Sequence, residues 1–251
     1  MYVRPGVVQK ADLWVFSLQN KQGYCDARLM TKKQKNLLLA RIPTYLAGIF
    51  IMTMGISLSV KSNLGVSPGS AVPYTMTCVW GLEMGVATIL FHFFLVFLQI
   101  ILLGKRFKIK NVMQAAASII LGYFTTFCNW CFGFFPDPQI IAVKMGLLLV
   151  SCFLIAFGMF LYVETKITPF AVVGTMIVIS ELTGMSFPKT KILCDVFMSI
   201  FSLSVCLLKI GDWGSIGIGT LITAVLVGII MDRIALYLGD WRAGILQIYL
   251  K

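Results

Sequence analysis

Six apolar segments of membrane-spanning length leave this chain few folds other than a helical bundle in a bilayer. Each is close to the ~20 residues that an α-helix needs to cross the hydrocarbon core. Backbone groups in that core must form their hydrogen bonds within the chain, so we expect these segments to be helices. Charged residues make up only 12% of the sequence, well below the roughly 25% of soluble domains. The predicted spans are Ile42–Val60, Met84–Leu103, Val112–Phe134, Ile140–Val163, Thr190–Leu208 and Ser215–Tyr237.

Two further apolar segments, Ser67–Trp80 and Thr168–Leu182, are too short to cross comfortably. Ser67 suits a helix N-cap and Pro68 suits the first helical position, and Thr168-Pro169 is expected to open the second short helix in the same way. If both short helices are re-entrant, only Lys61, Lys144 and Lys209 of the 21 Lys and Arg residues lie outside. If both cross, seven lie outside. The positive-inside rule therefore favours six spans, with both chain termini in the cytoplasm.

The chain also repeats itself at a spacing of 103 residues. An odd number of spans in each copy inverts the second copy relative to the first. We therefore predict an all-α integral membrane protein with six transmembrane helices and two re-entrant half-helices, arranged as an inverted 3+3 repeat. The expected parts are a basic N-terminal tail (1–41), repeat 1 (42–134), repeat 2 (140–237) and a short C-terminal tail (238–251). The matched residues are Phe50, Gly55, Val60, Gly81, Leu90 and Phe94 with Phe153, Gly158, Val163, Gly184, Leu193 and Phe197.

Interrupted helices at corresponding places in two halves of a membrane protein point to a transporter site. The N-terminus of each short helix directs a positive dipole end and free N–H groups toward the break, which suits an anionic group. The alternative is that side-chain caps satisfy these groups and that nothing binds. The candidate substrate-binding residues are Ser67, Pro68, Gly69, Thr168 and Pro169.

Polar residues inside membrane spans mark a pathway by default. His92 matches Asp195 at the repeat spacing, and Asn129 matches Asp232. His92 is the single histidine, and histidine changes its charge near neutral pH. These four residues are the candidate proton or polar pathway. The structural alternatives are a neutral core histidine, a lysine partner for Asp195 and an interfacial position for Asp232.

Other chemistries have less support in the sequence. Cys128 and Cys131 form a C-x-x-C near the predicted outer end of a span, where a membrane thiol oxidoreductase could use them. The alternative is that both are small packing residues. One histidine and scattered cysteines provide no metal-ligand set, and no cofactor motif is recognisable. The net charge of +11 arises from residues at span ends, so it indicates membrane orientation and no nucleic-acid partner.

Two short motifs suggest a family. Residues 217–232 read Gly-x-Gly-Thr, an apolar run, Gly and a terminal acidic residue. This pattern resembles the last membrane helix of the YczE/YyaS/YitT-like group of bacterial membrane proteins. Leu64-Gly65-Val66-Ser67-Pro68 is similar to the Leu-Gly-x-x-Pro element of that group, whereas the second break lacks Leu-Gly. The resemblance covers roughly residues 42–238 and implies a multi-span protein of the bacterial cytoplasmic membrane.

We therefore expect a small-solute transporter or channel-like permease, for an anionic solute if the half-helix ends bind it, with its site at the repeat interface and lipid around it. One alternative is the solute-capture subunit of a larger transporter, with a partner subunit or a homo-oligomeric assembly. Two others are the thiol oxidoreductase and a membrane scaffold without a ligand. A thermal-shift screen against metabolites would separate binding from scaffolding.

Overall fold

The protein is described by a computed structural model over residues 32–107, 112–165 and 167–237, and these residues contain eight α-helices and no strand. The tails predicted at 1–41 and 238–251 lie largely outside the described residues, although α2 begins inside the first of them. The helices are α2 (Lys32–Ser62), α3 (Pro68–Trp80), α4 (Met84–Leu103), α5 (Met113–Gly133), α6 (Ile141–Glu164), α7 (Ala171–Thr183), α8 (Phe187–Lys209) and α9 (Ile218–Tyr237), with the short 3-10 helix η1 (Gly104–Arg106) after α4.

Five of these helices are long and apolar enough to cross a membrane, namely α2, α4, α5, α6 and α8. In α2 the apolar stretch covers Arg41–Ser62, and in α9 it covers the shorter Ile218–Met231. The prediction of an all-α membrane protein is therefore confirmed. Each long predicted span falls on one observed helix, because apolar length alone determines where a chain can satisfy its backbone inside a bilayer.

The short helices end in the same way. Gly81 follows α3 with φ 66°, and Gly184 follows α7 with φ 68°. This left-handed conformation is one that glycine adopts without a steric penalty, and it commonly terminates helices. α3 and α7 have 13 residues each, and each is followed within a few residues by a long helix, α4 or α8. Both turns are therefore tight reversals from a short helix into a long one.

Two predicted helix starts are wrong. Ser67 and Pro68 do occupy the N-cap and first position of α3, but α7 begins at Ala171, with Phe170 as its N-cap, so Thr168-Pro169 stands before the helix. Phe170 stays extended because its ring packs 4.6 Å from the ring of Tyr162, on α6. The last span begins at Ile218, because Ser215 accepts a hydrogen bond from the backbone N–H of Val66.

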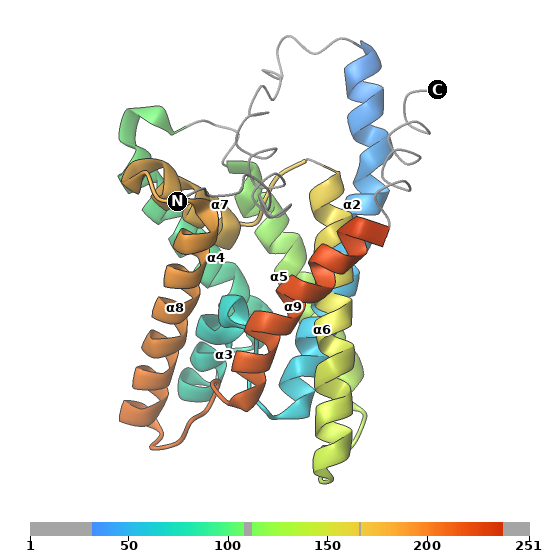
Figure 1. Cartoon of the computed structure of the whole chain (residues 1–251), viewed down its shortest axis with the longest axis vertical. Coiled ribbons are helices and arrows are strands. Elements are labelled where there is room, and N and C mark those ends of the chain that lie inside the picture. Colours follow the sequence, from blue (N-terminus) through green and yellow to red (C-terminus); the bar gives the residue numbers. More distant parts are fainter. Residues whose placement is uncertain (1–31, 108–111, 166, 238–251) are drawn as a thin grey trace, which may run out of the picture.

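Figure 1 shows that the long helices alternate in direction along the chain, with α3 in the lower half of the molecule and α7 in the upper half. The most extensive helix contact joins α2 and α6. They approach so closely that a Cβ on Gly158 would lie 2.6 Å from the carbonyl oxygen of Gly48. α3 packs mainly on α8, and α7 packs mainly on α4. Each short helix therefore lies against a long helix from the other half of the chain.

Candidate functional site

One face of α5 carries polar side chains through the interior of the bundle. Gln114, Ser118, Thr125 and Asn129 follow one another at intervals of four, seven and four residues, which places them on one side of a helix. The first three are buried and Asn129 is half-buried. Polar side chains are costly in a hydrocarbon environment and are retained there mostly for function. This set is called the α5 polar face below.

At one end of the α5 polar face lies a buried cluster around His92. Nδ1 of His92 is 2.8 Å from Oγ of Ser118, and that hydroxyl donates its proton to the carbonyl oxygen of Gln114 at 2.6 Å. Because the hydroxyl has only one proton, the His92 Nδ1–H is the donor in the first bond, and Nε2 of a neutral ring is left as an acceptor. His92 is 4% exposed, and the centroid of its ring lies 6.2 Å from the centroid of the Phe170 ring.

Gln99 extends this cluster from α4 to α7. Its Nε2 donates to Oε1 of Gln114 at 3.0 Å, to Oγ1 of Thr175 at 3.1 Å and to the carbonyl oxygen of Ala171 at 3.2 Å. Its Oε1 is buried and has no hydrogen-bond partner among the described residues. The His92 cluster, meaning His92, Gln99, Gln114, Ser118 and Thr175, therefore borders the first turn of α7 and keeps one acceptor available.

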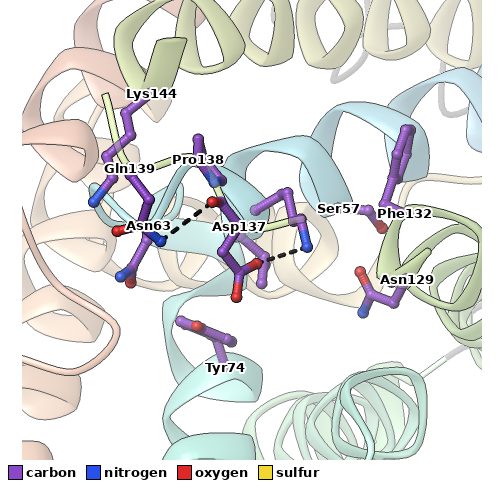
Figure 2. A pocket seen from close by; sticks show the side chains of 12 residues that line it. Ser57, Asn63, Tyr74, Asn129, Phe132, Asp137, Pro138, Gln139 and Lys144 are labelled. Atoms are coloured by element: carbon purple, nitrogen blue, oxygen red, sulfur yellow. Dashed lines mark hydrogen bonds and ion pairs between the residues drawn. The ribbon is translucent and has the colours of Figure 1, made fainter. Parts of the chain in front are cut away.

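At the other end of the α5 polar face, Asn129 lines a pocket of about 500 Å³ between the end of α2, α3, the end of α5 and the start of α6. Figure 2 shows Asp137 near its centre. Nζ of Lys61 lies 2.6 Å from Oδ1 of Asp137. Asn63 contributes from the first break, which is the segment between α2 and α3, and it has a left-handed φ of 52° there. The second break is the segment between α6 and α7. The pocket is lined by Ser57, Val60, Lys61, Asn63, Tyr74, Asn129, Phe132, Gly133, Asp137, Pro138, Gln139 and Lys144.

The first break is held by the start of α9. The backbone N–H of Gly219 donates to the carbonyl oxygen of Leu64 at 2.7 Å. A Cβ on Gly65 would lie 2.6 Å from the backbone nitrogen of Gly217. Nearby, the hydroxyls of Thr75 and Ser215 are hydrogen-bonded at 2.6 Å. The two motifs that suggested a family therefore contact each other, and their glycines permit that contact.

The candidate substrate-binding residues do not gather at one point. Oγ of Ser67 is hydrogen-bonded to Oγ of Ser70 at 2.8 Å. A Cβ placed on Gly69 would have no neighbouring atom within 4 Å. Pro68 is buried in the first turn of α3. Thr168 and Pro169 lie in the other break, where the Tyr45 hydroxyl donates to the carbonyl oxygen of Thr168 at 3.2 Å. The first break is next to the pocket, and the second is next to the His92 cluster.

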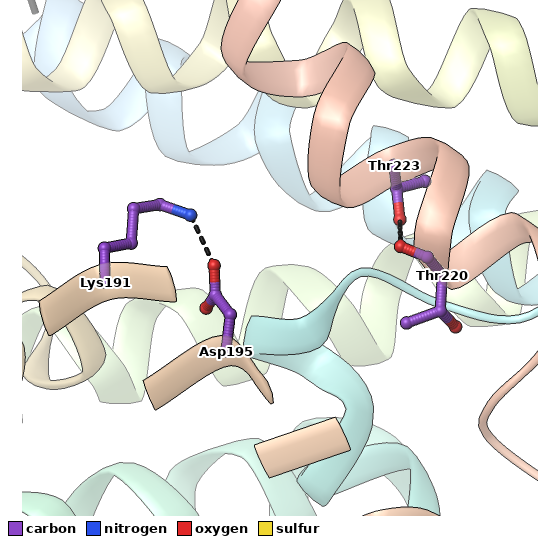
Figure 3. A network of polar contacts seen from close by, with 4 residues as sticks. All are labelled: Lys191, Asp195, Thr220 and Thr223. Carbon is purple, nitrogen blue, oxygen red and sulfur yellow. Dashed lines mark hydrogen bonds and ion pairs between the residues drawn. The ribbon is translucent and has the colours of Figure 1, made fainter. Parts of the chain in front are cut away.

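One matched pair, His92 and Asp195, is placed in two different surroundings. Asp195 forms an ion pair with Lys191, one turn earlier on α8, at 2.5 Å (Figure 3). No hydrogen bond joins Asp195 to His92 within the described parts of the chain. The same view shows Thr220 and Thr223 on α9, where the Thr223 hydroxyl donates to the carbonyl oxygen of Thr220 at 3.0 Å. Asp232 lies on α9, and its side chain is outside the described part of the structure.

The two C-x-x-C cysteines occupy different surroundings. Cys128 is 2% exposed, and its Sγ lies 3.6 Å from Oγ1 of Thr53. Cys131, one turn further along α5, is half-buried, and both thiols are free. Among the residues described, no group of three His, Cys, Asp or Glu side chains could hold a metal ion.

Several side chains of the site were not predictable as site residues from the motifs alone. Gln99, Gln114 and Ser118 hold His92 or extend its cluster, and Tyr74 and Lys144 line the pocket. The spacing of Gln114, Ser118, Thr125 and Asn129 was a readable signal, because four polar residues on one side of an apolar helix are uncommon. For Tyr74 and Lys144 the sequence held no comparable signal, since only the folded chain brings them into the same pocket as Asn129.

Comparisons with known proteins agree with these motifs. The chain is 26% identical over 200 residues to the protein of Bacillus subtilis (strain 168) described as uncharacterized membrane protein YczE, covering 78% of this chain and 86% of that one. It is 28% identical over 198 residues to uncharacterized protein YyaS of the same organism, covering 74% and 88%. No solved structure matches. The family of unknown function DUF6198 matches residues 39–235, which hold nearly all the described helices, so this chain belongs to that family.

Proposed function

We propose that this protein is a permease that moves a small polar solute across the bacterial cytoplasmic membrane along the α5 polar face. The observation that carries the proposal is the continuity of that face between the pocket and the His92 cluster. Oγ of Ser57, at the pocket, and Oε1 of Gln99, in the cluster, are buried without hydrogen-bond partners among the described residues. Each can therefore bond a solute at no cost to an existing contact, which suits a path for polar molecules.

An inverted repeat is the architecture that best supports this proposal. α7 has the same length as α3 and starts 103 residues later, and α8 starts 103 residues after α4. Gly48 and Gly158 are in contact, and their counterparts at the repeat spacing are Ser151 and Gly55. These two are also in contact, because a Cβ on Gly55 would lie 2.9 Å from the Ser151 carbonyl oxygen. Such reciprocal contacts are expected where two repeats face each other across a pseudo-twofold axis.

In this proposal each break serves one end of the path. The break with Ser67, Pro68 and Gly69 flanks the pocket, and the break with Thr168 and Pro169 flanks the His92 cluster. Alternating access would then move one repeat against the other, and His92 would be the proton-sensitive group. Asp195, Asn129 and Asp232 remain the other proposed pathway groups.

A second candidate, the solute-capture subunit of a larger transporter, has one observation in its favour. α8 is the least buried of the five long apolar helices. Its outward side carries large apolar residues such as Phe197 and Leu208, which either lipid or a partner helix could cover. Purification from its native membrane distinguishes the two, because a capture subunit co-purifies with its energising partners and a permease does not need them.

The permease proposal predicts that Asn129→Leu reduces flux. A screen for metabolites that raise the unfolding temperature identifies a solute, and uptake of that solute into proteoliposomes is then measured. We expect uptake to fall about tenfold in Asn129→Leu, because a lost hydrogen bond to solute costs ~1.5 kcal/mol. The control is Tyr123→Leu, on the exposed side of the same helix, which should transport normally. Equal uptake in both variants would place the path away from α5.

The proposed orientation predicts which loops a membrane-impermeant thiol reagent reaches. In a cysteine-free background, Asp137→Cys and Asp212→Cys should be labelled in intact cells. Ser186→Cys should react only after the cells are opened, because it precedes α8 at the opposite end of the bundle from those two loops. Labelling of Ser186→Cys in intact cells would contradict the six-span orientation and its cytoplasmic termini.

A further inference from the structure

The charges of the pocket point to the class of solute that enters it. Resting on the permease proposal above, we propose that the pocket selects a small organic anion with one carboxylate at one end and hydroxyl or amide groups at the other. The selecting residue is Lys144, in the first turn of α6.

Lys144 is the uncompensated charge of the pocket. Of the three charged residues that line it, Lys61 and Asp137 are paired at 2.6 Å. Lys144 forms no ion pair within the described residues, so the lining carries one net positive charge. Figure 2 places its side chain at the same end of the pocket as Asn63 and Gln139. An ammonium beside amide donors suits a carboxylate, whose two oxygens accept several hydrogen bonds.

A cationic solute is disfavoured by the same arrangement. The charge of Asp137, the acidic group of the pocket, is already neutralised by Lys61, so the lining has no net negative charge to attract a cation. A solute with two negative charges would find only one free cation. The balance of charges therefore favours a single negative charge.

The far end of the pocket suits uncharged polar groups. Ser57 has a buried hydroxyl without a partner among the described residues, and Asn129 and Tyr74 add an amide and a phenol. The volume of about 500 Å³ lies within the range of sites for metabolite-sized ligands, about 300–1,000 Å³, and exceeds what an inorganic anion fills. A polyhydroxylated monocarboxylate matches both ends.

Three linear polyols of nearly equal size test the proposal. Gluconate is an anion, sorbitol is neutral and N-methylglucamine is a cation, and their affinities for the purified protein are measured by calorimetry and by thermal shift. We expect gluconate to bind at least about tenfold more tightly than sorbitol, because it gains a charge-assisted hydrogen bond, and N-methylglucamine to bind most weakly. In Lys144→Gln, gluconate should fall to the affinity of sorbitol.

The control is Lys209→Gln, which removes the same charge from an exposed lysine that does not line the pocket. It should keep the preference for gluconate. Absence of gluconate binding, equal binding of gluconate and sorbitol, or a preference that survives Lys144→Gln would each overturn the anion site. Lys144-dependent gluconate binding without flux in proteoliposomes would support the anion site and contradict the permease proposal, so the two failures are distinguishable.

Discussion

Replacement of Gly158 by alanine is expected to destabilise the bundle strongly, and replacement by leucine to prevent it from folding. A Cβ at this position would lie 2.5 Å from the backbone nitrogen of Met52 and 2.6 Å from the carbonyl oxygen of Gly48. Both atoms belong to the backbone of α2, so no flexible side chain can move aside. α2 and α6 must separate, and they form the largest helix contact of the protein. Overpacking typically costs ~1–3 kcal/mol, and a collision between two backbones belongs at or above the upper end.

The same helix provides a matched control. Gly146 also lies on α6, is exposed, and has no atom within 4 Å of a Cβ placed on it. Gly146→Ala should leave the free energy of unfolding unchanged or raise it by up to ~1 kcal/mol, since alanine is the better helix former. The measurement is unfolding in mixed micelles, followed by helical circular dichroism for both variants and the parent protein. A Gly158→Ala protein as stable as Gly146→Ala would mean that α2 and α6 are further apart than described.

Helix positions were largely predictable from the sequence, and the reason is physical. A bilayer allows only fully hydrogen-bonded backbone, so apolar length alone placed Met84–Leu103, which is the observed α4. Ser67-Pro68 was readable as a helix start because a proline at the first position lacks only an N–H that would have no partner there. Local rules suffice where the cause is local.

Tertiary packing explains the failures. Thr168-Pro169 has the same local pattern as Ser67-Pro68, yet the helix starts at Ala171, because the Phe170 ring inserts between Tyr162 and His92. No local pattern in the sequence announces that insertion. Likewise, Lys144 is an ordinary lysine at a helix end until the fold brings it into the same pocket as Asn63. The two helix interruptions were predictable from the sequence, but the side chains that surround each of them were not.

Breaking the contact between the first break and α9 is expected to produce the largest loss of function. In Gly217→Ala, the new methyl group would collide with the carbonyl oxygen of Leu64. Relief requires Leu64 and Gly65 to move away from α9, and the hydrogen bonds from Gly219 to Leu64 and from Val66 to Ser215 must then lengthen or break. Because Asn63 lies next to this segment and lines the pocket, the same movement distorts the proposed solute site.

We therefore expect Gly217→Ala to lose most solute binding and flux while the long helices remain inserted, since the collision is confined to the segments before α3 and α9. The expected stability loss is ~1–3 kcal/mol, and the loss of affinity should be at least about tenfold if one hydrogen bond to a charged solute group fails. Gly228→Ala is the control, because it lies on α9 with no atom within 4 Å of its Cβ. Solute affinity and unfolding temperature are measured for both. If Gly217→Ala unfolds globally, then the break is part of the core. If it binds solute as the parent does, the contact between the two family motifs stabilises the helices and does not shape the pocket.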